Sequence, residues 1–135
     1  MNIFILDPNP ELAAIYHNDK HIVKMPVEMA QMLCTNIYYL NDLTSKAKAN
    51  KNLELVYKIF KDFPPPKSSP YPFYLFAFPN NPCTIWLRES QANMKWGLEL
   101  FRQLLIEYTF RYEKHRDLEK VYFWIRDNFP YDKIK

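Results

Sequence analysis

The sequence has 135 residues and a single glycine, Gly97. An average composition, with glycine near 7%, would supply about nine. Loops that hold phosphate on backbone amides need several glycines close together, because the chain must turn tightly and approach the ligand. The scarcity of glycine therefore excludes the Walker A loop, the dinucleotide-binding fingerprint and the kinase glycine-rich loop. It also argues against an all-β fold, whose turns would need glycine at many positions.

Cysteines and long apolar runs are also scarce. Cys34 and Cys83 lie far apart in the sequence and do not form a metal-binding motif. Asp7 interrupts the apolar start, and no run of about 18 apolar residues follows, so neither a signal peptide nor a membrane-spanning segment is expected. We therefore expect reduced thiols and a cytoplasmic protein, in the cytoplasm of a host cell if the protein is viral. We also expect a monomer without a cofactor.

Positive charge is concentrated in one part of a chain whose formal net charge is +3. Residues 44–67 carry six lysines against two acidic residues: Lys46, Lys48, Lys51, Lys58, Lys61 and Lys67 against Glu54 and Asp62. Such a segment permits contact with a polyanion. A solvated lysine-rich loop explains it equally well.

The spacing of apolar residues predicts an all-α fold in one domain that spans residues 1–135. We expect helices over 11–39, 53–60, 82–112 and 117–128, a loop over 41–52, and a proline-rich irregular connection over 64–82. Pro26 predicts a kink near residues 22–25, and Gly97 predicts a bend in the long third helix. Asn81 and Pro82 are typical of an N-cap and a first helical residue. The aromatic residues of the proline-rich connection indicate that it packs over the core.

One polar stripe stands out on the first predicted helix, opposite an apolar face made by Ile15, Ile22, Met29 and Leu33. Its members, spaced by four and three residues, fall within about 80° of one another on a helix: His17, His21, Lys24, Glu28, Gln31 and Thr35. The ordinary polar face of an amphipathic helix is one interpretation. A divalent-metal site at the two histidines is a second, although no third ligand is evident and we predict no metal. The third is an acid/base or electrostatic site with Glu28 as its carboxylate.

A second polar and aromatic cluster follows Asn81 on the third predicted helix, made of Trp86, Arg88, Glu89, Asn93 and Trp96. A buried Arg or Glu that links this helix to the first is one explanation, and substrate contact is the other. Further along, Glu107 and Arg111 have the favourable order of an i,i+4 pair and predict a solvated salt bridge.

Two short motifs and the chain's end carry a resemblance to a known family. Asp19-Lys20-His21-Ile22-Val23, with Glu28-Met29 seven residues after the histidine, resembles the first helix of the phage pyrimidine-dimer DNA glycosylases of the endonuclease V type. Pro79-Asn80-Asn81-Pro82 resembles their second motif, and Tyr122–Lys135 resembles their aromatic, basic tail. Those proteins are small, single-domain and all-α. The start of the chain also resembles a group of small phage and large-virus proteins with the pattern Met-Asn-Ile-Phe-x-Leu-Asp.

The resemblance implies a DNA repair glycosylase and abasic-site lyase that acts on damaged duplex DNA. In that family the α-amino group of the chain attacks C1′ of the damaged nucleotide, and a glutamate assists elimination at the sugar. Carried over, Glu28 is the catalytic carboxylate and His21 its upstream partner. Asn2 stands where the family has Thr and is too large for efficient removal of the first residue, so the amine would belong to Met1. The residues that would bind substrate are His17, Lys20, Lys24, Asn81, Arg88 and Asn93.

The sequence departs from the family beside the carboxylate, where Val27 and Gln31 replace arginines, and in the second motif, where Asn81 replaces a histidine. Two other classes of function stay open. One is a non-catalytic small viral protein that binds nucleic acid or a host protein through its basic and aromatic surfaces. The other is a metal- or nucleotide-dependent hydrolase.

Overall fold

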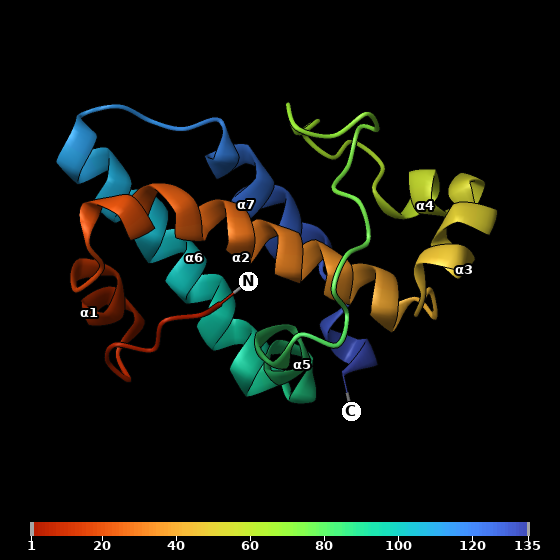
Figure 1. Ribbon diagram of the computed structural model, residues 1–135, viewed down its shortest axis with the longest axis horizontal. Coiled ribbons are helices and arrows are strands. Elements are labelled where there is room, and N and C mark those ends of the chain that lie inside the picture. Colours follow the sequence, from red (N-terminus) through yellow and green to blue (C-terminus); the bar gives the residue numbers. More distant parts are fainter. Residues whose placement is uncertain (1, 135) are drawn as a thin grey trace.

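The computed structural model describes residues 2–134, and the predicted all-α fold is confirmed: this part of the chain contains helices and no strand. The two longest helices, of 22 residues each, contact each other, and the remaining elements are arranged around them (Figure 1). In chain order the elements are α1 (Pro10–Ile15), α2 (Asp19–Leu40), α3 (Lys46–Lys51), α4 (Leu53–Ile59), α5 (Pro82–Glu89), α6 (Gln91–Tyr112), α7 (Leu118–Asn128) and the 3-10 helix η1 (Tyr131–Lys133). Within residues 2–134 no helix combines the length and the apolar character that crossing a membrane requires.

The first predicted helix divides at residues 16–18, before α2, and α2 continues through residues 22–25, so the break that Pro26 could have caused there does not occur. Asn18 ends the connection, and its side chain accepts the backbone N–H of His21, which starts a new helix. Pro26 lies buried inside α2 without ending it. A proline leaves carbonyls of the preceding turn without their usual donors. Here the guanidinium of Arg116 donates to the carbonyl of Val23 at 2.8 Å, which offsets part of that loss.

The stretch predicted as a loop over 41–52 contains helix α3. Ser45 caps it by accepting the backbone N–H of Lys48, and Ala49 is its buried residue. A single buried alanine gives no apolar periodicity, which is why the pattern did not reveal this helix. The next helix, α4, matches its prediction.

The long helix predicted over 82–112 breaks at Ser90 and not at Gly97. Ser90 is extended, and its side chain accepts the backbone N–H of Asn93 to cap α6. Gly97 lies buried in the middle of α6, where a Cβ atom would overlap Cδ2 of Leu87 on α5. The glycine therefore allows α5 and α6 to approach each other closely.

Replacing Gly97 with alanine should destabilise the fold by about 1–2 kcal/mol. Overpacking of a core costs about 1–3 kcal/mol, and the better helix propensity of alanine returns at most about 1 kcal/mol. Leu87 is fully buried, so its side chain has no open space to enter. Urea unfolding of Gly97→Ala, Leu87→Ala and the double variant measures the effect. The double variant should lose less than the sum of the single losses, and strict additivity would show that the two residues do not compete for space.

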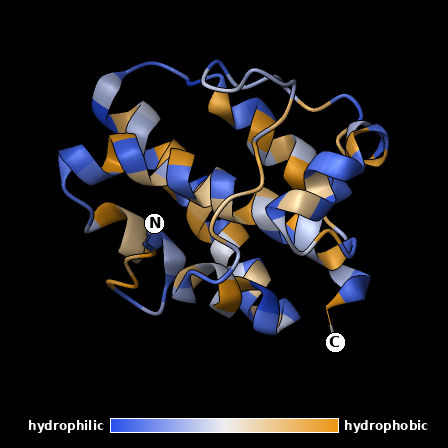
Figure 2. Ribbon diagram, turned by 45° about the vertical axis from the view of Figure 1, so that its right-hand side comes forward, coloured by the Kyte–Doolittle hydropathy of each residue, from blue (hydrophilic) through white to orange (hydrophobic). Residues whose placement is uncertain are grey.

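The proline-rich connection packs over the core through its aromatic residues, as predicted. The ring of Phe73 stacks on that of Phe60, the residue after α4, with centroids 5.6 Å apart, and the hydroxyl of Tyr38 on α2 donates to the carbonyl of Tyr74 at 2.8 Å. Phe73, Tyr74 and Phe76 are buried in one continuous core cluster that includes residues of α1 to α7. Figure 2 colours part of this connection as hydrophobic where it crosses the helices.

Candidate functional site

Five members of the polar stripe lie along α2, and one does not. His21, Lys24, Glu28, Gln31 and Thr35 are all within the helix, from an exposed Lys24 to a fully buried Thr35. The first histidine, His17, belongs instead to the turn between α1 and α2, which the continuous helix of the prediction did not contain. Ile15, predicted on the apolar face, is 44% exposed for the same reason.

His17 is buried beneath the start of the chain. Its Nδ1 atom lies 2.6 Å from the carbonyl of Ala13, and because a carbonyl only accepts, Nδ1 carries the proton. Nε2 is then a buried acceptor without a hydrogen-bond partner among residues 2–134. Burial lowers the pKa of His17 below its ordinary value, and the nearby His21 and Arg111 lower it further. His17 is therefore a neutral, structural imidazole near neutral pH.

The burial of His17 predicts a loss of stability in acid. The unfolded chain keeps the ordinary histidine pKa of about 6.5, so it binds protons more readily than the folded protein between that value and the lowered one. The free energy of unfolding should fall as the pH drops below about 6.5, by up to about 1.4 kcal/mol per pH unit, and level off below the folded pKa. His17→Gln should remove this part of the pH dependence in urea titrations. His115→Gln, at an imidazole that is 79% exposed, serves as the control and should leave it in place.

The start of the chain lies against α2 and α5. The ring of Phe4 stacks on the imidazole of His21, with centroids 4.6 Å apart and an interplanar angle of 20°. The backbone N–H of Ile3 donates to Sγ of Cys83, near the beginning of α5, at 3.3 Å. The indole N–H of Trp96 on α6 donates to the carbonyl of Pro8 at 2.8 Å. These contacts fix residues 3 to 8 on the helices (Figure 1); Asn2 is exposed, and Met1 lies outside the described residues.

Glu28 lies on α2 between one residue that contacts the start of the chain and one that binds the proline-rich connection. His21 is two turns before it and Thr35 two turns after it on the same face of α2. His21 contacts Phe4, and Thr35 binds the segment that leads into α5. Glu28 itself is partly buried, and its Oε2 atom is enclosed. His21 and Glu28 thus share one face of α2, and His21 contacts the N-terminal segment at Phe4, whereas Lys20 and Lys24 are exposed on the first two turns of the helix.

The predicted substrate-binding residues of α5 and α6 have structural partners. Arg88 donates to Oδ1 of Asn36 at 3.2 Å and to the carbonyl of Pro79 at 2.7 Å, and its guanidinium lies 3.8 Å from the ring centroid of Tyr39. Burial lowers the pKa of Arg88. Arg88 therefore links α5 to α2, which is the structural explanation given for this cluster above.

Asn81 and Asn93 also have roles in the backbone. Asn81 caps α5 by accepting the backbone N–H of Cys83 at 3.0 Å, as predicted. Asn93 donates to the carbonyl of Trp86 at 2.9 Å and so bridges α5 and α6.

Further along α6, Arg111 is bound by Glu107 and Asp19 and is only 18% exposed, so the predicted solvated pair is a half-buried link between α6 and α2.

Three grooves adjoin the proline-rich connection, and the sequence did not reveal them. The Lys46 groove, of about 400 Å³, is lined by residues 44–46 and 76–80. The Gln31 groove, of about 290 Å³, is lined by Gln31, Ser68, Ser69, Tyr74, Leu75, Ala77 and Phe78. The Lys114 groove, of about 750 Å³, is lined by Val27, residues 64–68, Tyr74, Tyr108, residues 114–118, Lys120 and Val121. The Gln31 groove and the Lys114 groove share Ser68 and Tyr74. Gln31 lies one helical turn after Glu28, and Val27, in the Lys114 groove, is the residue directly before Glu28.

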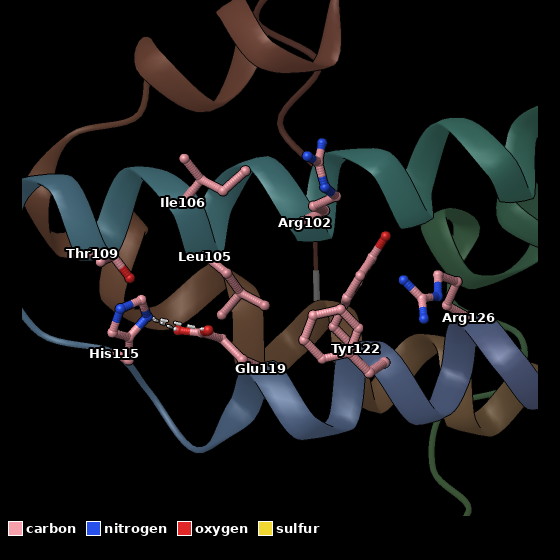
Figure 3. A pocket seen from close by; sticks show the side chains of 9 residues that line it. Arg102, Leu105, Ile106, Thr109, His115, Glu119, Tyr122 and Arg126 are labelled. Atoms are coloured by element: carbon pink, nitrogen blue, oxygen red, sulfur yellow. Dashed lines mark hydrogen bonds and ion pairs between the residues drawn. The ribbon is translucent and has the colours of Figure 1, made fainter.

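A further cavity of about 370 Å³ lies between α6 and α7 and contains no residue of the polar stripe. Figure 3 shows Leu105 of α6 pointing toward α7, which carries Tyr122, with the paired His115 and Glu119 at one end; Ile106 also lines the cavity. Its two arginines are paired with acidic neighbours, Arg102 with Glu99 and Arg126 with Asp127. The cavity is therefore apolar with little free charge.

The residues do not suggest a metal centre: among residues 2–134, no three His, Cys, Asp or Glu side chains lie close enough together to hold an ion. Comparison of the chain with protein-family models, with curated proteins and with solved structures gave no match. The function must therefore be argued from the site itself.

Proposed function

We propose that this protein is a DNA glycosylase and abasic-site lyase that acts on damaged duplex DNA, with Glu28 as its catalytic carboxylate. The observation that carries the proposal is the position of Glu28. It is a partly buried carboxylate on the face of α2 where His21 contacts Phe4 and where the segment leading into α5 is bound. The contact of Phe4 with His21, two turns before Glu28 on the same face, supports assigning the first residues of the sequence and the required acidic group to one site.

The proposed nucleophile is the α-amino group of Met1, whose ordinary pKa near 8 leaves a useful neutral fraction at pH 7. Its lone pair forms a bond to C1′ of the damaged nucleotide, the bond from C1′ to the base breaks, and the base leaves with that electron pair and takes up a proton. The amine loses a proton and the sugar ring opens to give an imine. Loss of a proton from C2′ then forms a double bond between C2′ and C3′ and expels the phosphate oxygen bonded to C3′, which cuts the strand. Water finally hydrolyses the imine and frees the amine.

Glu28 has two tasks in this scheme. Its negative charge stabilises the cationic sugar and the protonated imine, and its carboxylate accepts the C2′ proton. His21 is a positioning residue, because its ring holds Phe4 and thereby the start of the chain. Lys20 and Lys24 are exposed on the same helix and are available to DNA phosphates.

A strand-cleavage assay tests the proposal. Duplexes that carry one pyrimidine dimer or one abasic site should be cut at the lesion without added metal or cofactor, while the undamaged duplex stays intact. Failure to cut either substrate would overturn the enzymatic proposal. Salt-sensitive binding without cleavage would instead favour the second candidate, a non-catalytic nucleic-acid-binding protein, which the basic lining of the Lys114 groove supports.

A further inference from the structure

Phe78 combines two features that a solvent-exposed aromatic residue rarely has. Its side chain is 68% exposed, and its backbone has φ = 52°. A positive φ is unfavourable for a bulky L-residue, and strained backbone of this kind persists only where the surroundings enforce it. The chain therefore holds an aromatic ring in water at a position that would suit glycine better.

The backbone on both sides of Phe78 is fixed by α2 and α5. The hydroxyl of Thr35 donates to the carbonyl of Ala77 at 3.0 Å and accepts its N–H at 3.4 Å. Arg88 donates to the carbonyl of Pro79 at 2.7 Å, and the N–H of Asn81 donates to the carbonyl of Phe78 at 3.2 Å. The ring is thus presented on a rigid support, which lowers the entropy cost of stacking a ligand on it.

Phe78 separates two grooves, one of which contains Lys46 while the other adjoins the basic Lys114 groove. It lines both the Lys46 groove and the Gln31 groove, and the Gln31 groove adjoins the Lys114 groove at Ser68 and Tyr74. Among the residues that line the three grooves, Asp117 alone is acidic. The basic ones are Lys46, Lys67, Lys114, Arg116 and Lys120. A basic path beside an exposed aromatic ring is the arrangement that binds a nucleic-acid strand through its phosphates and its bases.

We propose that Phe78 stacks on a nucleobase of a DNA strand whose phosphates contact Lys46 on one side of the ring and the basic lining of the Lys114 groove on the other. The choice of DNA rests on the proposed function, and the stacking deepens it. An exposed ring in a groove that includes Gln31, one turn after Glu28, would occupy the space of a displaced base or support an unpaired one. Stacking of one base on an aromatic side chain corresponds to about a 5- to 100-fold gain in affinity.

The test compares two fluorescein-labelled strands of equal length in anisotropy titrations, one with normal bases and one with abasic spacers at its centre. Phe78→Gly should lower the affinity for the normal strand about 5- to 100-fold. It should change the affinity for the spacer strand little. Phe78→Trp should keep the preference for bases. Phe110→Ala is the matched control, since Phe110 is 78% exposed on α6 and lines none of the three grooves. An unchanged preference for bases in Phe78→Gly would overturn the proposal.

Thermal unfolding separates binding from a structural role. Because glycine relieves the positive φ, Phe78→Gly should unfold at the same temperature as the wild-type protein or a higher one while it loses base preference. A lower unfolding temperature with parallel loss of affinity for both strands would assign Phe78 to the fold and overturn the proposal.

The basic path is tested by salt dependence. The double variant Lys67→Ala with Lys120→Ala should reduce the slope of log affinity against log salt by about 1.4. The control double variant, Lys58→Ala with Lys95→Ala, changes two lysines that line none of the three grooves and should leave the slope unchanged. Equal competition by poly-glutamate, with no preference for bases, would assign the grooves to an acidic protein and overturn the proposal. None of these measurements requires turnover, so stacking without cleavage would contradict the proposed enzyme and leave the stacking inference standing.

Discussion

Glu28→Gln should slow base release and strand cleavage by about 10²- to 10⁴-fold, the range that a positioned acid or base contributes. The amide keeps the shape of the side chain but removes the charge that stabilises the imine and the oxygen that accepts the C2′ proton. Since Glu28 is only partly buried, the change should leave the fold intact. Single-turnover cleavage of an abasic duplex measures the rate, and anisotropy with the same duplex measures binding, which should change little.

The matched control is Glu54→Gln, an exposed glutamate in the first turn of α4. It removes the same charge away from the site and should cleave at the wild-type rate. A wild-type rate in Glu28→Gln, or an equal loss in both variants, would remove Glu28 from the mechanism. Circular dichroism of both variants shows whether any lost rate reflects lost structure.

Phe60→Ala should lower the free energy of unfolding by about 3–5 kcal/mol, as do other truncations of buried Phe. Phe60 is 3% exposed, and its ring contacts four others at centroid distances of 5.0 to 5.6 Å: those of Tyr38, Phe63, Phe73 and Trp124. These rings come from α2, from α7, from Phe63 just before the proline-rich connection and from Phe73 within it. The truncation therefore loosens the segment that carries the grooves as well as the core.

Guanidinium unfolding monitored by circular dichroism measures this loss. Leu55→Ala, on α4 and 43% exposed, is the control and should change stability by no more than about 0.5 kcal/mol. Equal effects of the two variants would mean that the aromatic cluster does not stabilise the fold. In Phe60→Ala the DNA affinity should also fall, because Tyr74 of the same connection lines two grooves.

The sequence carried strong signals where single residues satisfy the ends of helices. Asn81 before Pro82 predicts a helix start, and Asn81 accepts a free N–H group of α5. Asn9 before Pro10 caps α1 in the same way. The breaks were harder to predict, because apolar spacing continues across them. Pro26 and Gly97 have low intrinsic helix propensity, yet Arg116 and the close approach of Leu87 explain their place inside helices.

The candidate site was predicted in part. The spacing placed His21, Glu28 and Thr35 on one face of α2, and the structure has them there. It could not show that His17 lies outside the helix, because the cap at Asn18 looks like any polar residue of an exposed face. Phe78 was missed as well, since neither its positive φ nor its exposure follows from the pattern of prolines around it.

Borohydride trapping on an abasic duplex tests the central claim most directly, because only an imine between the protein and the sugar is reduced to a stable covalent bond. The account predicts one covalent complex, with the modification on the peptide that contains Met1 and with less of it in Glu28→Gln if the carboxylate promotes imine formation. Attachment at Lys20 or Lys24 would contradict the assigned nucleophile. No covalent complex on any DNA, from protein that is folded and binds the duplex, would contradict the proposed enzyme altogether.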